Sequence, residues 1–433
     1  MAVANGGGSR ADQRLVADAI AAYARKPHPV ALCCGVHHYG WGDRRFIPQL
    51  LGAESPAVDP QAELWIGAHP ERPATACLHP ARIPLDVLVA ALPDAVLGAA
   101  TVARFGATLP FLFKVLAAAT PLSIQAHPNR TQAANGFWRE DRLGLALNDP
   151  RRSYRDRNHK PELLVALTDF HALGGFRPLE AIAAELARWP PLADLGRRFD
   201  ASAHGLRTLY AEFMRLPQTA IDARLAPLVT AAQRRCSDPK DTSRERCRWL
   251  LAAHRRYSPR GHYDRGLLSF LLLNLLHLRP GQAIFLPAGE LHSYLQGAGL
   301  ELMANSNNVL RGGLSAKHID VDALLEVLRV DPHVPRIMAP QTAAHDPRWQ
   351  IYAPPVAEFS LRRLRLGVGD AAPLEPHAVM LGLVLDGTIH IDGAASRLRL
   401  HRGGTCLLPA GARLQITSRG GADLALATTA ACG

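Results

Sequence analysis

Apolar residues recur every three or four positions in three stretches in the middle of the chain. The stretches LEAIAAELARW, GLRTLYAEFMRL and RERCRWLLAAHRRY fall between residue 179 and about residue 260. This spacing is typical of amphipathic helices. Because no cluster of ligand-forming side chains accompanies them, we predict a helical insertion over residues 179–262 and expect the functional residues elsewhere.

Shorter apolar runs with glycine and proline punctuation flank this insertion and predict strands. Leu109–Leu116 (LPFLFKVL) and Pro121–His127 (PLSIQAH) are such runs, and from Phe359 to the end the chain is strand-like. We predict a small all-β C-terminal domain with turns at Asp386-Gly387, Asp392-Gly393 and Gly403-Gly404.

Four further segments have distinct patterns. Asp12–Arg25 predicts a short helix, and Asp320–Arg329 predicts an amphipathic helix that is capped by an aspartate. Leu267–Leu278 is strongly apolar and is interpreted as a buried helix. His333–Pro355 is rich in proline and is predicted to be a connector.

One strand–turn–strand pattern occurs twice. Residues 281–292 read GQAIFLPAGELH, and residues 403–414 read GGTCLLPAGARL. Each copy places a Pro-Ala-Gly turn between two strand-like segments, which is a unit from which β-barrels are built. The final position is His292 in the first copy and Leu414 in the second. We therefore predict two related β-barrels, of which only the first has a polar site.

The composition is that of an ordinary globular protein with more than one domain. Of the 433 residues, 48% are hydrophobic and 20% are charged. The formal net charge of +11, from 49 basic and 38 acidic residues, raises nucleic acid as a partner. The basic residues are scattered, however, and no basic tract is interleaved with aromatic residues. A surface suited to an anionic small molecule fits at least as well, and we expect no nucleic-acid partner.

Cysteine usage and hydropathy indicate the compartment. The seven cysteines form no CxxC pair and no dense scaffold, which favours a reducing environment, and the adjacent Cys33 and Cys34 are interpreted as buried packing. The N-terminus shows no apolar signal-peptide core, and Leu267–Leu278 is shorter than the roughly 20 residues that cross a bilayer. We expect a cytoplasmic protein with no membrane partner.

Two short polar motifs suggest metal ligands in the first barrel. Gln125 and His127 are two apart on a predicted strand, so both side chains leave one face; a half-buried polar pair near a strand end is the alternative. Lys160 and Glu162 belong to NHKPE, which is either a solvated turn or a strand start that points into the barrel. With His292, the set becomes Gln, His, Glu and His, which suits a catalytic zinc. Because the ligands come from distant segments, spacing alone does not establish the site.

Two cations stand in unusual places. Arg311 lies in the loop-like segment Glu301–Gly313 (ELMANSNNVLRGG), where its planar guanidinium is suited to a phosphate; a simple surface arginine is the alternative. Lys114 stands between apolar residues of a predicted strand. It therefore either extends to the surface or faces a polar cavity.

Taken together, these motifs resemble those of type I phosphomannose isomerases, zinc-dependent cupin enzymes that interconvert mannose 6-phosphate and fructose 6-phosphate. The resemblance covers about residues 35–178 and 265–330. It rests on YGWG, AELWIGAHP, FLFKVL, PLSIQAHPN, DRNHKPELLVALTDFHALGGFRP, PGQAIFLPAGELHSYL and ELMANSNNVLRGGL.

The resemblance implies a mainly β fold with cupin-type β-barrels. A catalytic cupin domain would span residues 30–178 and 263–335, interrupted by the helical insertion. Residues 336–433 would form a C-terminal cupin-like β-domain without a metal site, and residues 1–29 an N-terminal segment. The resemblance further implies one Zn²⁺ per chain and a phosphorylated hexose as substrate, and we expect a monomer or a homodimer.

The resemblance also implies roles for single residues. The zinc ligands would be Gln125, His127, Glu162 and His292. The substrate would be bound by Lys114, Asn307, Arg311 and Lys317. A proton moves between C1 and C2 through a cis-enediol in such isomerases. The family pattern leaves open which group moves it, and the catalytic candidates are Lys160, His159, Glu301 and Arg311.

The sequence departs from the family pattern beside the predicted site. Ser306-Asn307-Asn308 stands where the family has Ser-Asp-Asn, so an amide replaces a carboxylate. Ser315-Ala316-Lys317 replaces Thr-Pro-Lys, and His38 and Asp43 flank the YGWG element where Asn and Ser are common. Asn307 leaves open an isomerase of another sugar or sugar phosphate. A non-catalytic metal-containing cupin that senses a sugar phosphate is a second alternative.

Overall fold

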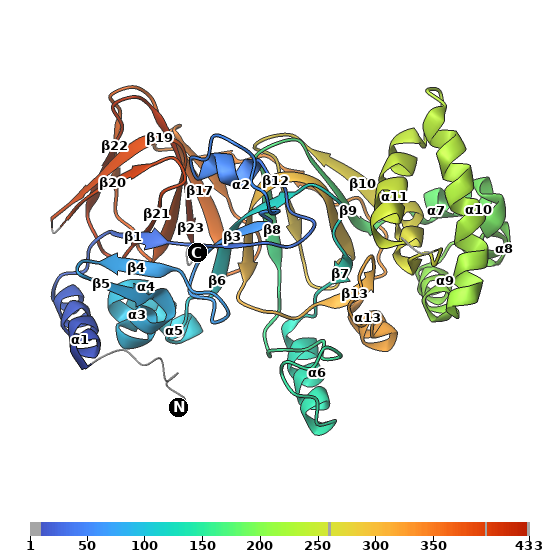
Figure 1. Cartoon of the computed structure of the whole chain (residues 1–433), viewed down its shortest axis with the longest axis horizontal. Coiled ribbons are helices and arrows are strands. Elements are labelled where there is room, and N and C mark those ends of the chain that lie inside the picture. The colour runs from blue at the N-terminus through green and yellow to red at the C-terminus, as the bar shows by residue number, and fades with distance from the viewer. Residues whose placement is uncertain (1–9, 259–260, 395, 431–433) are drawn as a thin grey trace. The chain divides into compact units, whose positions relative to one another are not determined.

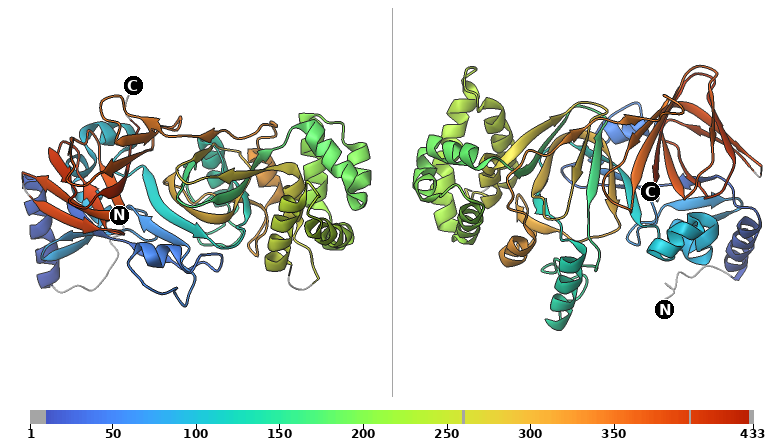
Figure 2. Two further views of the ribbon diagram at one scale, coloured as in Figure 1. Left: turned by 90° about the horizontal axis from the view of Figure 1, so that it is seen from above. Right: turned by 180° about the vertical axis from the view of Figure 1, so that it is seen from behind.

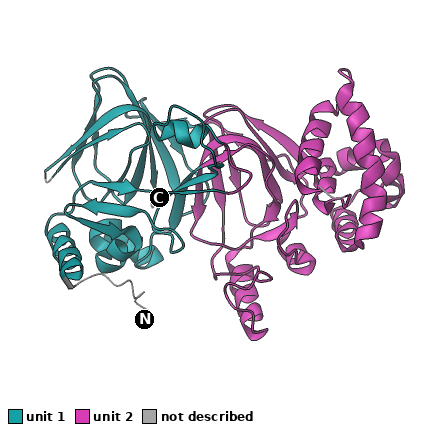
Figure 3. Ribbon diagram, in the orientation of Figure 1, with its two compact units in different colours: residues 1–38, 44–115, 340–433 teal, residues 39–43, 116–339 magenta. Residues whose placement is uncertain are grey.

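The structure is a computed structural model that describes residues 10–258, 261–394 and 396–430. The chain divides into two compact units (Figure 3). Unit 1 comprises residues 1–38, 44–115 and 340–433, and unit 2 comprises residues 39–43 and 116–339. Both units contain antiparallel sheets, so the predicted mainly β fold is confirmed. Among the described residues, no helix combines the length and the apolar character that crossing a membrane requires.

Unit 1 is organised by one antiparallel sheet, in which β15-β16-β17-β23-β19-β21-β1-β4-β5 are neighbours in that order (Figure 1). β18, β20 and β22 join it through β19 and β22. The strands are β1 (Val30–Cys33), β4 (Thr75–Leu78), β5 (Ala81–Pro84), β15 (Gln341–Thr342), β16 (Trp349–Tyr352), β17 (Ser360–Leu366), β18 (Ala371–Leu374), β19 (Met380–Gly393), β20 (Arg397–His401), β21 (Thr405–Leu408), β22 (Leu414–Thr417) and β23 (Ala422–Thr428).

Unit 1 also contains helices and a short strand pair near the N-terminus. β2 and β3 pair antiparallel, and β6 begins in this unit. The predicted helix at residues 12–25 is confirmed as α1. The elements are α1 (Arg10–Arg25), β2 (Gly35–His37), α2 (Phe46–Leu50), β3 (Glu63–Ile66), α3 (Leu85–Ala91), α4 (Pro93–Leu97), α5 (Ala99–Phe105) and β6 (Phe111–Ala118).

The alternation of side chains explains why the C-terminal residues form strands. In β18 the residues are exposed and buried in turn, as expected of a sheet with one face on the core. The inward residues, among them Leu364, Val384, Ile389 and Leu424, form one apolar cluster. The predicted β character of the chain from residue 359 onward is therefore confirmed.

Two predictions for the C-terminal part are wrong. Asp386-Gly387 is not a turn, because β19 continues through it with a bulge between Val384 and Asp386. Gly387, which pairs with Ala422 beyond the bulge, has φ 77°, and a Cβ there would collide with the backbone oxygen of Gly421, so this position requires glycine. The proline-rich segment 333–355 is also more than a connector, because it contains β14 (Ile337–Met338), β15 and β16.

The strands of unit 2 are arranged around the long strand β12. The order β14-β11-β8-β12 is antiparallel, and β12 also pairs with β7 and β9, which pair in turn with β13 and β10. All five residues of β8 are buried, which explains its continuous apolar sequence after the first position. The strands are β7 (Ile124–Ala126), β8 (Glu162–Ala166), β9 (Phe170–Phe176), β10 (Leu273–Leu278), β11 (Ala283–Leu286), β12 (His292–Ala304) and β13 (Leu310–Gly313).

Helices interrupt unit 2 between β9 and β10, and they gather at one end of that unit in each view (Figure 2). Their apolar faces bury Leu186, Tyr210 and Phe213, as their helical periodicity predicts. The predicted helical segment is therefore confirmed. Its helices are α7 (Leu179–Arg188), α8 (Ala193–Arg198), α9 (Ala203–Arg215), α10 (Gln218–Ser237) and α11 (Arg244–Tyr257).

Two other helices of unit 2 have clear caps. α13 (Val321–Val327) begins at Asp320, whose carboxylate accepts a hydrogen bond from the Ala323 amide at 2.9 Å, as predicted. α6 (Arg130–Arg142) was not predicted. It begins with a capping box in which Asn129 and Gln132 exchange hydrogen bonds.

The interpretation of residues 267–278 as one buried helix is wrong. Its first half forms a short 3₁₀ helix (Arg265–Leu268) and one turn of α-helix, α12 (Ser269–Leu272). Its second half is β10, which pairs along its length with β9. An apolar run of this length is compatible with a buried strand or a buried helix, and the pairing partner decides between them.

The two copies of the repeated pattern fold alike. In the first, β11 leads through Pro-Ala-Gly to β12, which begins at His292; in the second, β21 leads through the same turn to β22, which begins at Leu414. The glycines also correspond: φ is 87° and 79° at positions 281 and 289, and 80° and 75° at positions 403 and 411. The repeat is therefore structural as well as sequential.

Candidate metal centre

Three of the four predicted metal ligands converge in unit 2. His127, Glu162 and His292 each offer a ligand atom, and these atoms all lie within 4.8 Å of one another. His127 Nε2 is 3.3 Å from Glu162 Oε1, and His292 Nε2 is 3.3 Å from Glu162 Oε2. The three side chains are almost completely buried, with 1%, 2% and 1% of their surfaces exposed. This is the only such cluster found among the residues that the structure describes.

The strand pairing brings these distant segments together. His292, the first residue of β12, lies directly opposite Gln125 on β7. Residues that lie opposite each other in an antiparallel pair share a face of the sheet. Gln125 therefore lies on the side of the sheet that carries His292, next to the cluster.

Backbone carbonyls fix the orientation of both imidazoles. His127 Nδ1 lies 2.7 Å from the carbonyl oxygen of Asn308, and His292 Nδ1 lies 2.9 Å from that of Glu290. A carbonyl only accepts hydrogen bonds, so each Nδ1 carries a hydrogen, and in a neutral imidazole the nitrogen with the lone pair is then the Nε2 that faces Glu162. Second-sphere bonds of this kind commonly orient metal-bound histidines.

The ligand atoms that face one another are all acceptors. His127 Nε2, His292 Nε2 and Glu162 Oε2 are buried and have no hydrogen-bond partner among the described residues. Buried acceptors without a donor are costly, whereas a cation between them satisfies all three. Two imidazole nitrogens and one carboxylate are donors that fit a divalent zinc ion, with Gln125 available to complete its coordination.

The protonation states also suit a metal. Burial, followed by the charge of Lys160, lowers the pKa of His127 to about 4. Burial alone would raise the pKa of Glu162, but Lys160 and His127 outweigh it, so this pKa lies well below its ordinary range. At neutral pH, His127 is therefore neutral and Glu162 ionised, which are the forms that bind metal.

Lys160 is the cation nearest to the cluster. Its Nζ lies 3.0 Å from Glu162 Oε1, and only 8% of the residue is exposed. Glu162 is the first residue of β8 and Lys160 stands two positions before it, so their contact agrees with the predicted common face. The result is a buried site in which an ammonium group, a carboxylate and two imidazoles touch.

The chain is similar over most of its length to known isomerases. The family model "Phosphomannose isomerase type I, catalytic domain" matches residues 30–179. Mannose-6-phosphate isomerase of Escherichia coli K12 is 40% identical over 295 residues, which are 67% of this chain and 72% of that protein. The human mannose-6-phosphate isomerase is 32% identical over 414 residues, which are 89% of this chain and 94% of that protein. The chain belongs to the type I mannose-6-phosphate isomerase family.

Solved structures of the family agree with this assignment. A crystal structure of mannose 6-phosphate isomerase from Salmonella typhimurium, bound to its substrate fructose 6-phosphate and to zinc, superposes with a TM-score of 0.82. The two sequences are 32% identical, and the match covers 93% of this chain and 100% of that one. A zinc-bound mannose 6-phosphate isomerase structure matches equally well, with a TM-score of 0.82.

In this isomerase-family chain, Arg311 and Glu301 also lie on strands beside the cluster. Arg311, on β13, lies opposite Gln125 on β7, so the two side chains share a face of the sheet. Burial, followed by the charge of Arg155, lowers the pKa of Arg311. Glu301, 3% exposed, lies opposite Leu164 on β8, two positions from Glu162. The pairing therefore puts Glu301 on the Glu162 face of that strand pair.

A carboxylate that the sequence reasoning missed organises the segment with the family departure. Asp156 accepts hydrogen bonds from the Asn307 amide at 2.7 Å and from the Ser306 hydroxyl at 2.9 Å. The Asn308 side chain donates to the Asp156 backbone carbonyl at 2.9 Å, and the backbone carbonyl oxygen of Asn308 orients His127. Asp156 belongs to DRNHKPE, so its place in that motif was the available signal.

Three further predicted residues have contacts outside the cluster. Lys114, on β6 in unit 1, is 6% exposed, 3.7 Å from a Glu63 oxygen and 5.3 Å from the ring centre of Trp65, so it is buried against a polar partner. His159 is half-buried and contacts Arg130 at 3.2 Å. Lys317 is exposed beyond β13 and lines a hollow with Gln218, Asp264 and Arg265.

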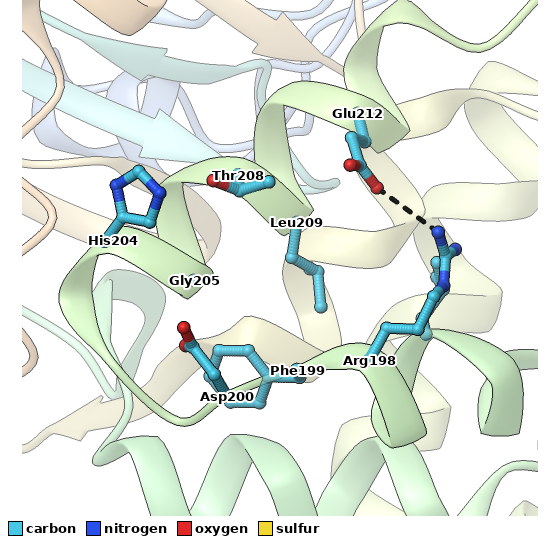
Figure 4. Close-up of a pocket in the computed structure, with 9 residues that line it drawn as sticks. Arg198, Phe199, Asp200, His204, Gly205, Thr208, Leu209 and Glu212 are labelled. Atoms are coloured by element: carbon cyan, nitrogen blue, oxygen red, sulfur yellow. Dashed lines mark ion pairs between the residues drawn. The ribbon is translucent and has the colours of Figure 1, made fainter.

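A second cavity lies in the helical insertion (Figure 4). It measures about 270 Å³ and is lined by residues of α8, α9 and the segment between them, including Phe199, His204 and Leu209. Arg198 at its edge is 3.7 Å from Glu212, so its charge is already paired. None of the predicted site residues lines this cavity.

Proposed function

We propose that the chain is a zinc-dependent aldose–ketose isomerase that interconverts mannose 6-phosphate and fructose 6-phosphate. The buried cluster of His127, Glu162 and His292 is the observation that carries this proposal. Its three acceptors face one another without a donor, which is the arrangement that a bound cation satisfies. The family relatives are mannose-6-phosphate isomerases, and the Salmonella enzyme binds zinc and fructose 6-phosphate.

One zinc would be held by His127, Glu162 and His292, with Gln125 as the fourth ligand. When bound, it supplies Lewis acidity that stabilises the negative charge developing on the oxygens at C1 and C2. The side chains then have to bind the sugar phosphate and move one proton between C1 and C2.

Lys160 is our first candidate for moving the proton. Its Nζ touches Glu162, so it stands beside the proposed metal ligand and is mostly shielded from water. Glu301 is a second candidate, because β12 pairs it with β8 two residues from Glu162. His159 is the third candidate. It is more exposed than Lys160, and its ring contacts Arg130.

The phosphate requires cations. Arg311 is half-buried on the face that carries Gln125, which suits it to bind an anion brought to the metal centre. Lys114 and Lys317 match the family motifs and complete the proposed substrate contacts together with Asn307, which stands where the family has an aspartate. The proposed substrate is accordingly a phosphorylated hexose.

The test is a coupled assay of mannose 6-phosphate conversion with zinc-loaded protein. We expect turnover in the wild type and a loss of it in His292→Ala and Gln125→Ala, with the fold retained by circular dichroism. Leu414→Ala is the matched control in the second copy and should keep the specific activity of the folded protein. Full activity in the His292→Ala variant would contradict the proposal.

A panel of sugars and sugar phosphates separates the proposal from its alternatives. Asn307, where the family has an aspartate, is the observation that favours another aldose or ketose substrate. A higher kcat/KM for another sugar would establish that alternative. Tight binding of mannose 6-phosphate without turnover of any sugar would establish a sensor.

A further inference from the structure

Two thiols in unit 1 are in contact on neighbouring strands. Cys33 ends β1 and Cys77 lies on β4, and their sulfur atoms are 3.4 Å apart. β1 and β4 pair antiparallel with Cys33 opposite Thr75. Cys77, two residues beyond Thr75, is the diagonal neighbour of Cys33 on the same face. The backbone thus already holds the two sulfurs at van der Waals distance.

Cys33 is the most accessible thiol among the described residues. It is exposed, Cys77 is half-buried, and Cys247 and Cys406 are buried. The interpretation of Cys33 and Cys34 as buried packing is therefore wrong for Cys33. Cys34 is half-buried on the other side, where its sulfur lies 3.3 Å from the Thr405 hydroxyl. An oxidant that arrives from solvent consequently meets Cys33 first, with Cys77 directly behind it.

A cation also stands beside this pair. Arg82 on β5 lies directly opposite Cys77 in the strand pairing. Burial, the larger effect, raises the pKa of Cys77, and the Arg82 charge acts against it. Cys77 is therefore mainly a thiol at neutral pH. It is better suited to attack a Cys33 that is already oxidised than to react with the oxidant itself.

We propose that Cys33 and Cys77 are a thiol oxidation site that forms a reversible intramolecular disulfide with a hydroperoxide. The Cys33 thiolate attacks the peroxide, the O–O bond breaks, and a sulfenic acid and an alcohol or water result. The Cys77 sulfur then attacks Cys33 Sγ, the S–S bond forms, the S–O bond breaks, and the oxygen leaves as water. In sum, two thiols are oxidised and one hydroperoxide is reduced to an alcohol and water.

The cross-link would close the loop of residues 34–76, which includes α2 and β3. A disulfide that closes a loop mainly restricts the unfolded chain, so the oxidised protein should melt at a higher temperature. His127, Glu162 and His292 lie outside this loop and would keep their contacts. The modification is therefore independent of the proposed function and can be tested whatever the catalytic outcome.

The experiment treats the full-length, zinc-loaded protein with hydrogen peroxide and maps its peptides without reduction. We expect one Cys33–Cys77 cross-linked peptide, the joint loss of these two free thiols, and their recovery with dithiothreitol. Cys33→Ser or Cys77→Ser should abolish the cross-link and the rise in melting temperature. Cys34→Ser and Cys236→Ser, which leave the pair intact, should retain both.

Three results would overturn the inference. One is a wild-type protein in which both thiols stay free after treatment. Another is oxidation of Cys33 to sulfinic acid while Cys77 remains reduced. The third is a disulfide that joins Cys33 to any cysteine other than Cys77, including one on a second copy of the chain. Because the wild-type peptide map decides among these, the conclusion does not depend on whether every variant folds.

Discussion

The two Gly-x₅-Pro-Ala-Gly segments have similar backbone conformations, but the first ends in the polar His292 and the second in the apolar Leu414. In each copy a glycine lies opposite the last residue on one side: Gly174 faces His292, and Gly393 faces Leu414. On the other side the copies differ, because His292 faces Gln125 whereas Leu414 faces Leu374. Strand pairing and turn geometry are thus common to both copies, and the residues that face the last position decide whether a metal can bind.

The side chains around His292 are polar, and those around Leu414 are apolar. His292 meets Glu162 and His127, and a backbone carbonyl orients its ring. Leu414 belongs to an apolar cluster with Ile416 and other residues of the C-terminal sheet. A single substitution should therefore remove the site from the first copy without creating one in the second.

Exchanging the two residues should have the largest effect. His292→Leu removes a ligand, and losing several kcal/mol of charge stabilisation lowers kcat/KM about a thousandfold. Leu414→His should leave kcat/KM of the folded enzyme unchanged and cost roughly 1–3 kcal/mol of stability, because it buries an imidazole without a partner. Zinc content, turnover and urea unfolding measure these effects. Zinc bound by a His292→Leu/Leu414→His double variant in unit 1 would refute the contrast.

Removing the ammonium group beside Glu162 should have the next largest effect. Lys160→Met should lower kcat about a hundredfold or more if the lysine moves the proton, with a smaller change in KM. Arg413→Met, at an exposed cation next to Leu414, is the matched control and should not affect the kinetics. Unchanged kcat in Lys160→Met would transfer the role to Glu301 or His159.

The support of His127 should matter less than the ligand itself. Asn308→Ala removes the side chain that accepts from the Arg155 and Asp156 amides and donates to the Asp156 carbonyl. The backbone carbonyl that orients His127 would then be held less firmly, and zinc affinity and kcat/KM should each fall about 10–100-fold. A competition titration with a zinc chelator measures the affinity. An unaltered affinity would show that the carbonyl is held by other contacts.

The corresponding glycines of the two copies should differ in tolerance. At Gly289 a Cβ would lie 2.6 Å from the Val327 oxygen, whereas at Gly411 it would meet nothing within 4 Å. Both have positive φ, so each alanine costs roughly 1 kcal/mol, and Gly289→Ala should cost about 1–3 kcal/mol more through its collision. Urea unfolding gives the difference. Equal losses of stability in the two variants would mean that the first turn relaxes.

The helical insertion, which belongs to unit 2, should make the free energy of unfolding modestly dependent on pH. Burial raises the pKa of Glu185, but hydrogen bonds from Trp189 and Arg177 outweigh it and keep this pKa below 4.5. The stabilisation is therefore complete above about pH 4.5 and is lost as the pH falls through the folded-state pKa. Glu185→Gln should cost roughly 1 kcal/mol at pH 7 and less at pH 3. A difference between wild type and variant that grows on acidification would contradict this sign.

The sequence could predict the elements with a clear period, whereas its short polar motifs gave only candidate ligands. Helices α7, α9 and α11 follow from their spacing, and His127 and Glu162 were candidates because of QxH and HKPE. The apolar run at residues 267–278 could not be resolved, because its second half is a strand only by virtue of its pairing with β9. Likewise, Asp386-Gly387 is not a turn, because both residues pair with β23 and β19 continues through them.

The contacts around the site depend on tertiary structure and were beyond sequence reasoning. Asp156 bonds to Ser306 and Asn307 across a sequence separation of about 150 positions, and its place in DRNHKPE does not reveal these partners. The sequence also cannot show which backbone carbonyls orient His127 and His292, because every residue has a carbonyl. The domain boundaries, the cytoplasmic location and the oligomeric state stay predictions.

The most direct measurement is the turnover of mannose 6-phosphate by the wild-type protein before and after removal of its metal by a chelator. We expect one zinc per chain before treatment, loss of turnover afterwards with an unchanged circular dichroism spectrum, and recovery on adding zinc. The Leu414→His variant should behave in the same way, and His292→Leu should recover little with zinc. Full turnover by the metal-free protein would contradict a metal centre at His127, Glu162 and His292.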